Sequence, residues 1–409
     1  MLKRSLSIQK RPAVTILEVL FSIMIVMVGL VGIAALLPVA LRQAGDSFAL
    51  SRSAVMSSSI AQQVIGSELK NPALNNWLIP DDVGGGVFRV FDGTNLNGVP
   101  VSSSPLAAAI GLNIGSGFCI DPLYWAAQPG ASSGTVPNCA GAEGGYRRAR
   151  FPYFREDFSP LNNPDANFGA LPAPLTHPRM LRISLQPNGI GTIPLSTIAA
   201  QELCASGDDF VAALNADKEA PFVRLYSQAS GTSAKVMSTN EFSWMVTLSP
   251  NEFGSPSYYT MGVVIFHRRD RGFLAGKATT QGVAYDATMP PNAERIMLAT
   301  NVSSSPRTTG GSGFSAALTA NLAIDSTVKV GDWIMLSRNV EISSTPLITK
   351  PVFRWYRVSA VSPESVTIPT WSRVVYLTGS DWSFSASYPT TATIVSNVAS
   401  VYERVISIQ

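Results

Sequence analysis

The sequence predicts an α+β protein, in which a long N-terminal transmembrane and amphipathic helix packs on an antiparallel β-rich exported domain. Residues 14–41 contain one charged residue, Glu18, in 28 positions, which is typical of a helix that crosses a membrane. From Met180 onward, β-branched and aromatic residues recur in short runs or in alternation, which is typical of strands. Charged residues make up only 14% of the chain, against ~25% in an average soluble protein, and this deficit favours an exported β-rich domain over a helical cytoplasmic enzyme.

The apolar segment is long enough to cross a membrane. As a helix, residues 14–41 would extend about 42 Å, against a hydrocarbon core of roughly 30 Å. Four basic residues precede the segment, and the next one in the chain is Arg42. The four are Lys3, Arg4, Lys10 and Arg11. Because cytoplasmic flanks carry the excess of Lys and Arg, we expect the N-terminus in the cytoplasm and the body on the opposite side.

Two other kinds of N-terminal segment compete with this interpretation. An ordinary secretory signal peptide has a shorter apolar region, and the run found here is too long for it. An uncleaved anchor has the right length but no use for Glu18, because an acidic residue inside a spanning helix costs on the order of 2.5 kcal/mol or more. Glu18 therefore indicates a functional partner for its carboxylate within the membrane.

The residues around Glu18 resemble the processing motif of type IV pilins and type II secretion pseudopilins. That motif joins a short basic leader to a small residue before the cut, a hydrophobic residue that becomes the new N-terminus, and a glutamate fifth after the cut. Here Ala13 stands before the cut, Val14 becomes the first residue and Glu18 is the fifth. The family usually has Gly before the cut and often Phe after it, so Ala13 and Val14 depart from its pattern.

This resemblance implies a processing route and a set of partners. A prepilin peptidase would remove residues 1–13 as a basic leader peptide, and the new N-terminus at Val14 would be methylated. In the family, the glutamate pairs with the N-terminal amine of a neighbouring subunit, and Glu18 would take that role. Such an amine has an intrinsic pKa of about 7.7 to 8.0, so it is largely protonated at neutral pH and needs an anion. The implied partners are the peptidase, other pilin or pseudopilin subunits and the inner membrane.

The helix is expected to continue past the membrane over residues 42–71. Pro38 removes one backbone donor and should kink the helix near that position. Several apolar residues then recur at helical spacings and predict one face of an amphipathic helix. They are Leu50, Ala54, Ala61, Ile65 and Leu69. Asn71-Pro72 should end the helix. The arrangement resembles the pilin spine, whose second half lies under a globular head.

The body is expected to contain two β-rich parts. Residues 72–300 should form an exported β-rich domain with long loops, because Gly, Pro, Asn and Ser are frequent up to about residue 178. Residues 301–315, NVSSSPRTTGGSGFS, have the composition of a flexible linker. Residues 316–409 should form a C-terminal β-rich region, and VFRWYRV at 352–358 is typical of a half-buried strand.

Only three cysteines occur, Cys119, Cys139 and Cys204, and none belongs to a CxxC pair. Cys119 and Cys139 lie in one Gly- and Pro-rich stretch, where a disulfide formed in an oxidising periplasm would stabilise the loop by about 3 kcal/mol. The alternative is that the cysteines are reduced and buried. Their spacing supports no metal cluster.

Composition and motifs argue against several classes of function. Without residues 1–13, the chain keeps 26 basic and 27 acidic residues, so the body lacks the basic surface that nucleic-acid binding needs. No nucleophile elbow, HExxH, P-loop or dinucleotide fingerprint occurs in the sequence. The two histidines, His177 and His267, have no metal-ligand spacing. We therefore expect no catalytic residue, no cofactor and no bound metal.

The sequence thus predicts a minor pilin or pseudopilin, a structural subunit of a type IV pilus or type II secretion filament rather than an enzyme. Its 409 residues favour a minor role, because a bulky head is hard to repeat at every position of a tightly wound filament. The alternative is a membrane-anchored periplasmic enzyme, or a binding or adhesin module, that uses the helix only as a tether. Such a protein would need a concave site with perturbed titratable groups.

Overall fold

The computed structural model describes a long helix and a strand-rich body, and every structural statement below refers to its described residues. These residues are 16–65, 77–81, 87–90, 117–126, 150–152, 178–185, 195, 200, 203–204, 210–214, 224–227, 234–238, 242–252, 258–269, 294–302, 307–308, 313–321, 327–344, 347–367, 370–385 and 387–407. The expectation of an α+β fold with a long N-terminal helix and an antiparallel β-rich body is confirmed.

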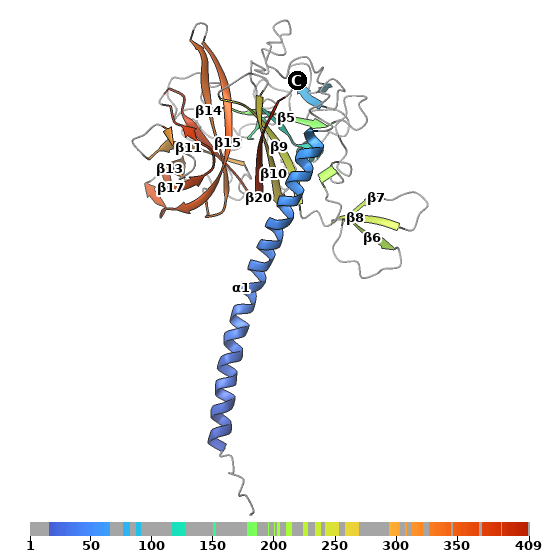
Figure 1. Ribbon diagram of the computed structural model, residues 1–409, viewed down its shortest axis with the longest axis vertical. Helices are drawn as coiled ribbons and strands as arrows, with labels where there is room; N and C mark the ends of the chain where they lie inside the picture. The colour runs from blue at the N-terminus through green and yellow to red at the C-terminus, as the bar shows by residue number, and fades with distance from the viewer. Residues whose placement is uncertain are drawn as a thin grey trace, which may run out of the picture. The chain divides into compact units, whose positions relative to one another are not determined.

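The helix α1 runs from Ile16 to Gln63 and continues through Pro38 (Figure 1). The described parts of the segments predicted as residues 14–41 and 42–71 form one continuous helix. Residues 66–76, where the helix was expected to end, lie outside the described residues. The chain divides into two compact units between Arg52 and Ser53, so the last turns of α1 belong to the second unit.

The last turns of α1 are amphipathic. Their buried residues are spaced three and four positions apart, as one face of a helix requires. They are Ser53, Met56, Ser57, Ile60, Ala61 and Val64. The predicted face was wrong at two positions, because Leu50 is 44% exposed and Ala54 is exposed. The actual stripe follows Met56, Ile60 and Val64, whose steps of four residues keep them on one side.

An eight-stranded sheet makes up the first part of the second unit. Its strands are β1 Trp77–Asp81, β2 Val87–Val90, β3 Phe118–Ile120, β4 Arg150–Phe151, β5 Met180–Leu185, β9 Phe242–Pro250, β10 Tyr258–His267 and β20 Val398–Ser407. Their order is β2-β1-β5-β3-β9-β10-β20, with β4 paired to β5. The pair β3–β5 is parallel and the other pairs are antiparallel. A short helix, α3 Pro122–Ala126, follows β3.

Six further strands close into a barrel. They are β11 Glu294–Asn301, β13 Phe314–Asn321, β14 Trp333–Ser344, β15 Leu347–Val361, β17 Thr370–Thr378 and β19 Thr390–Val395. Their order is β13-β11-β19-β14-β15-β17, and β13 also pairs with β17, from Phe314 opposite Leu377 to Asn321 opposite Thr370, which closes the ring. The strand β16, Ser365–Thr367, extends the sheet beside β17. Closure removes sheet edges that would otherwise stay open to pairing.

The barrel interior is filled by alternate side chains of its strands. In β13, Phe314, Ala316 and Leu318 are buried, while the residues between them are partly exposed. This period of two is what a strand with one face toward a core requires. The Phe314 ring meets Tyr356 edge-on at 5.2 Å between centroids, and Tyr356 meets Trp382 at 6.2 Å. Apolar side chains therefore pack the barrel as a core.

Two small sheets complete the described strands. One contains β6 Phe210–Leu214, β7 Arg224–Ser227 and β8 Ala234–Ser238, in the order β6-β8-β7. The other pairs β12 Arg307–Thr308 with β18 Trp382–Ser383, and β18 brings Trp382 to the barrel core.

The barrel and the eight-stranded sheet share a core. Met245 of β9 and Val264 of β10 belong to one buried cluster with Trp355 of β15. The Trp355 indole N–H donates a hydrogen bond to the Thr247 hydroxyl over 3.1 Å. Gly262 makes room for this ring, because a Cβ at that position would lie 3.1 Å from Trp355 Cδ1. The contact leaves no space for a larger residue at position 262.

The strand pairing changes the division of the body that the sequence suggested. Residues 301–315, predicted as a linker, connect β11 to β13, and these two strands pair with each other in the barrel. The segment therefore joins neighbours within one sheet and separates no domains. The barrel begins at Glu294, and the last strand, β20, returns to the eight-stranded sheet. Such non-local pairings carry no signal in local composition.

Candidate functional site: the N-terminal helix

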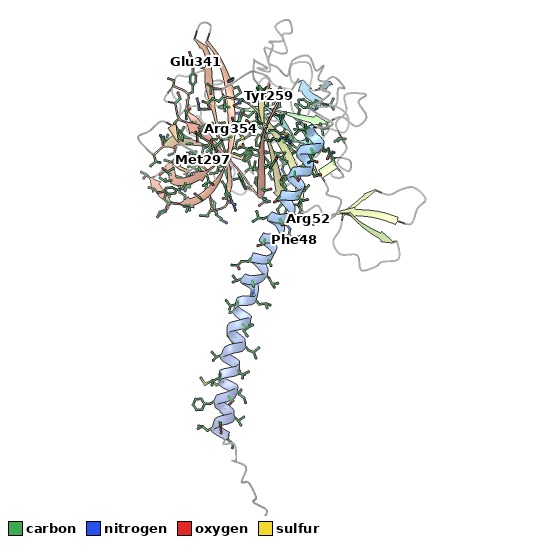
Figure 2. The ribbon with its side chains drawn as sticks, viewed as in Figure 1. Phe48, Arg52, Tyr259, Met297, Glu341 and Arg354 are labelled. Carbon is green, nitrogen blue, oxygen red and sulfur yellow. The ribbon has the colours of Figure 1, made fainter. Side chains whose placement is uncertain are left out.

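The first part of α1 presents an apolar surface on all sides. Every residue from Ile16 to Leu41 is exposed, and Ile16, Ile25 and Val31 are 82%, 70% and 69% exposed. Figure 2 shows side chains projecting outward along this helix. An exposed apolar surface of this extent marks a site that contacts a membrane or another protein. By its length and apolar composition, α1 is able to cross a membrane.

Glu18 lies in the first turn of the described helix. One turn later, the Ser22 hydroxyl donates a hydrogen bond to the Glu18 carbonyl oxygen over 2.8 Å, which keeps that hydroxyl within the helix. The predicted cleavage residues, Ala13 and Val14, lie outside the described residues. Of the three predicted processing and assembly residues, the structure thus places Glu18.

The apolar surface of α1 extends beyond Arg42. Phe48, labelled in Figure 2, is 64% exposed and Val55 is 70% exposed. Val55 belongs to the second unit but lies on the side of the helix away from Met56 and Ile60, which are buried. Positions 48 and 55 are seven residues apart and therefore share one face. This face is therefore an exposed apolar surface beyond Arg42.

The structure does not support the candidate disulfide. Cys119 is a free thiol and is completely buried in β3, with its sulfur 3.9 Å from the Met245 sulfur. Burial raises the pKa of the Cys119 thiol well above its usual value, which keeps it protonated and unreactive. Cys139 lies outside the described residues, and Cys204 is a second buried cysteine that forms no disulfide. Cys119 thus fits the alternative of a reduced, buried cysteine.

A buried charge network was missed by the sequence interpretation. Arg269 donates to both carboxylate oxygens of Asp121, over 2.9 and 2.7 Å. Arg182 donates to both oxygens of Glu294, over 2.7 and 2.8 Å, and its other terminal nitrogen lies 3.6 Å from Asp121. The side chains of Asp121, Arg182 and Glu294 are fully buried. Two cations and two anions balance within one network, as buried charges require.

This network joins the sheet to the barrel. Asp121 follows β3 and caps α3, because its carboxylate accepts a hydrogen bond from the Tyr124 N–H over 3.2 Å. Arg182 belongs to β5 and stacks over the Tyr124 ring at 3.8 Å, whereas Glu294 belongs to the barrel strand β11. Burial disfavours the charged form of Asp121, but Arg269 and Arg182 lower its pKa below the usual value. Both buried carboxylates are therefore bound to arginines.

A single sequence signal could have revealed part of this network. Arg182 is a lone charge in the otherwise apolar strand MLRISL, and such a residue is buried only with a partner. Its partner Glu294 lies 112 positions away and has no local signal. The Asp121-Pro122 step is a recognisable start of a helix, with Pro at its first position.

A second polar cluster also holds the sheet against the barrel. It lies between the end of β9 and the hairpin of β14 and β15. Lys350 donates to the Asn251 carbonyl over 2.6 Å, and Arg354 donates to the Asn251 side-chain oxygen over 3.3 Å. Arg338 donates to Glu252 and also, over 2.6 Å, to the Ser383 hydroxyl. The cluster therefore holds the middle of the long hairpin against the end of β9.

Comparisons of the chain with models of known protein families, with curated proteins and with solved structures give no match. Within the described residues, no group of three or more His, Cys, Asp or Glu side chains could hold a metal ion. The exposed helix is thus the feature of the described structure with the most direct functional meaning.

Proposed function

We propose that the chain is a minor pilin or pseudopilin, inserted in the inner membrane through α1, cut by a prepilin peptidase and assembled into a type IV pilus or type II secretion filament. The observation that carries the proposal is the combination of a fully exposed apolar helix with an acid, Glu18, in its first turn. A simple tether needs the apolar surface but has no use for the acid. A subunit that packs its helix against other helices uses both.

The four basic residues before the helix support the orientation. They keep the leader in the cytoplasm, where the peptidase would cut after Ala13, and leave the body in the periplasm or on a surface filament. The new amine at Val14 would stand one helical turn from Glu18 in its own chain and would pair with Glu18 of a neighbouring subunit. Two groups that are each costly in an apolar bundle would then compensate each other.

The proposal predicts that Glu18→Gln blocks assembly without blocking membrane insertion. Gln keeps the shape of the side chain but removes its charge, so a neighbouring amine stays buried without an anion. Losing one partner of such a pair costs about 3 kcal/mol or more, on the order of a hundredfold in subunit affinity. The measurement is the fraction of the chain recovered in sheared filaments relative to membranes, by immunoblot.

Ser22→Ala is the matched control, because the Ser22 hydroxyl bonds within the helix, one turn from Glu18. It should leave assembly at the wild-type level. If the Glu18→Gln chain is recovered in filaments as well as the wild-type chain, Glu18 has no role in assembly.

A further inference from the structure

The C-terminal strand β20 forms an open edge of the eight-stranded sheet. It pairs with β10 over its whole length, from Val398 to Ser407, and stands last in the strand order. The strand at the opposite end, β2, spans only Val87–Val90. A long edge strand offers a row of unpaired backbone groups to any strand that can lie beside it.

The alternation of the ladder shows which backbone groups face outward. The Asn251 N–H donates to the Tyr258 carbonyl over 3.1 Å, so this carbonyl of β10 points toward β9. In an antiparallel ladder, even-numbered residues of β10 then bond to β9 and odd-numbered ones to β20. Because Val263 pairs with Tyr402, the residues that point away from β10 are Val401, Glu403 and Val405. Within the described residues, their outward backbone groups have no hydrogen-bond partner.

Side chains on both faces of this edge are exposed. Tyr402 is 39% exposed and Arg404, on the same face, is exposed as well. On the other face, Val405 is 56% exposed and the neighbouring Tyr258 is 46% exposed. The barrel therefore leaves this corner of the sheet uncovered.

We infer that the outer edge of β20 binds an extended segment of a partner protein as an additional strand. Backbone pairing at Val401, Glu403 and Val405 supplies the affinity, and side chains on the two faces supply the specificity. The segment carries apolar residues on the face of Val405 and Tyr258, and an acidic residue on the face of Arg404. In the described part of the chain, Arg404 has no ion pair.

A second copy of β20 fits this edge less well than a different protein. The only acid in the strand is Glu403, and its carboxylate already accepts a hydrogen bond from the Trp355 N–H over 3.0 Å. Another β20 therefore brings no free carboxylate to Arg404. The charge at this edge that lacks an ion-pair partner among the described residues is the positive charge of Arg404. A strand that complements the edge therefore carries an acidic residue.

The test uses a photoreactive residue at the edge of the full-length chain. p-Benzoylphenylalanine replaces Tyr402, and intact cells are irradiated before the adduct is isolated and its partner peptide mapped. Val405→Pro removes an outward N–H and leaves the bonds to β10 in place, because residue 405 points away from β10. Val405→Thr is the matched control, since it keeps both the N–H and a β-branched side chain.

We expect an adduct to one partner segment that alternates apolar residues with an acid. Val405→Pro should lower its yield about tenfold through the lost hydrogen bond and the blocked approach, whereas Val405→Thr should keep it. Arg404→Glu should lower the yield by a similar factor, and this exposed substitution leaves the fold intact even where the proline variant does not.

No adduct, an adduct to a second copy, or an adduct that survives Arg404→Glu would overturn the inference. The experiment is independent of processing at Val14, so a failure of either proposal leaves the other standing.

Discussion

At the scale of single residues, the buried charge network makes the stability of the body sensitive to the loss of any one of its members. Asp121, Arg182, Arg269 and Glu294 come from four separate places in the chain and neutralise one another's charges. Taking charges out of water costs several kcal/mol per ion, and the attraction between partners offsets this cost only when all are present. Each member therefore matters more than its single contact suggests.

We predict that Arg182→Met destabilises the body by about 3–5 kcal/mol, because Glu294 would remain buried without a cation. The measurement is the urea midpoint of the full-length chain in detergent, followed by near-UV circular dichroism. Arg357→Met is the control, since Arg357 is an exposed residue whose loss should change stability by less than about 0.5 kcal/mol. Similar midpoints for the two variants would show that the network is not a stabilising unit.

Asp121 should make the body sensitive to acid. Its folded pKa lies below its unfolded value, so its contribution to stability is present above the unfolded pKa of about 3.9 and is lost as pH falls toward the folded value. The melting temperatures of wild type and Asp121→Asn should therefore converge as pH falls below about 4. Asp381→Asn, at an exposed position, should follow wild type throughout. A gap between wild type and Asp121→Asn that is constant with pH would contradict this account.

Glu18 and Arg182 differ in what the sequence could reveal about them. Glu18 was found because a single acid interrupts a long apolar run, a signal that needs no structure. Arg182 gives a similar signal within a short strand, but its partners lie 61 and 112 positions away along the chain. The pairing of such residues depends on strand order, which local sequence does not contain.

At the scale of elements, the pattern of apolar residues in the sequence predicts where a strand lies better than how long it is. The strand predicted at residues 352–358, VFRWYRV, lies within β15, which is longer and runs from Leu347 to Val361. Its hairpin partner β14 extends to Ser344, although the distal residues RNVEISS lack an apolar pattern. Those residues are held as a strand by their pairing with β15. No feature of the sequence predicted that β13 and β17 pair with each other and close the barrel.

The packing between β10 and β15 gives a prediction at this scale. A Cβ at Gly262 would lie 2.7 Å from the Thr247 hydroxyl and 3.1 Å from Trp355, both buried, so Gly262→Ala should destabilise the body by about 1–3 kcal/mol. The thermal midpoint by circular dichroism measures this loss.

Gly45→Ala is the matched control for Gly262→Ala. No atom lies within 4 Å of a Cβ at Gly45, which stands in α1, and Ala should favour the helix by up to about 1 kcal/mol. Loss of stability in both variants would mean that the clash at Gly262 is not the cause.

At the scale of the whole molecule, the chain combines two units with different surroundings. The first ends at Arg52 and exposes apolar side chains that water does not stabilise, whereas the second, from Ser53, has buried cores in its sheet and barrel. One N-terminal helix able to cross a membrane fits a single-pass membrane protein. The proposed function adds two steps, cleavage by a prepilin peptidase and assembly into a filament. Both steps depend on the residues between Ala13 and Glu18.

The most direct test is the N-terminal sequence and intact mass of the chain purified from membranes, from cells with and without prepilin peptidase. The account predicts a mature chain that begins at Val14 and carries one added methyl group when the peptidase is present, and an unprocessed chain when it is absent. A chain that keeps Met1 in both strains, or one cut beyond residue 34, would contradict the account and favour a tethered enzyme or binding protein.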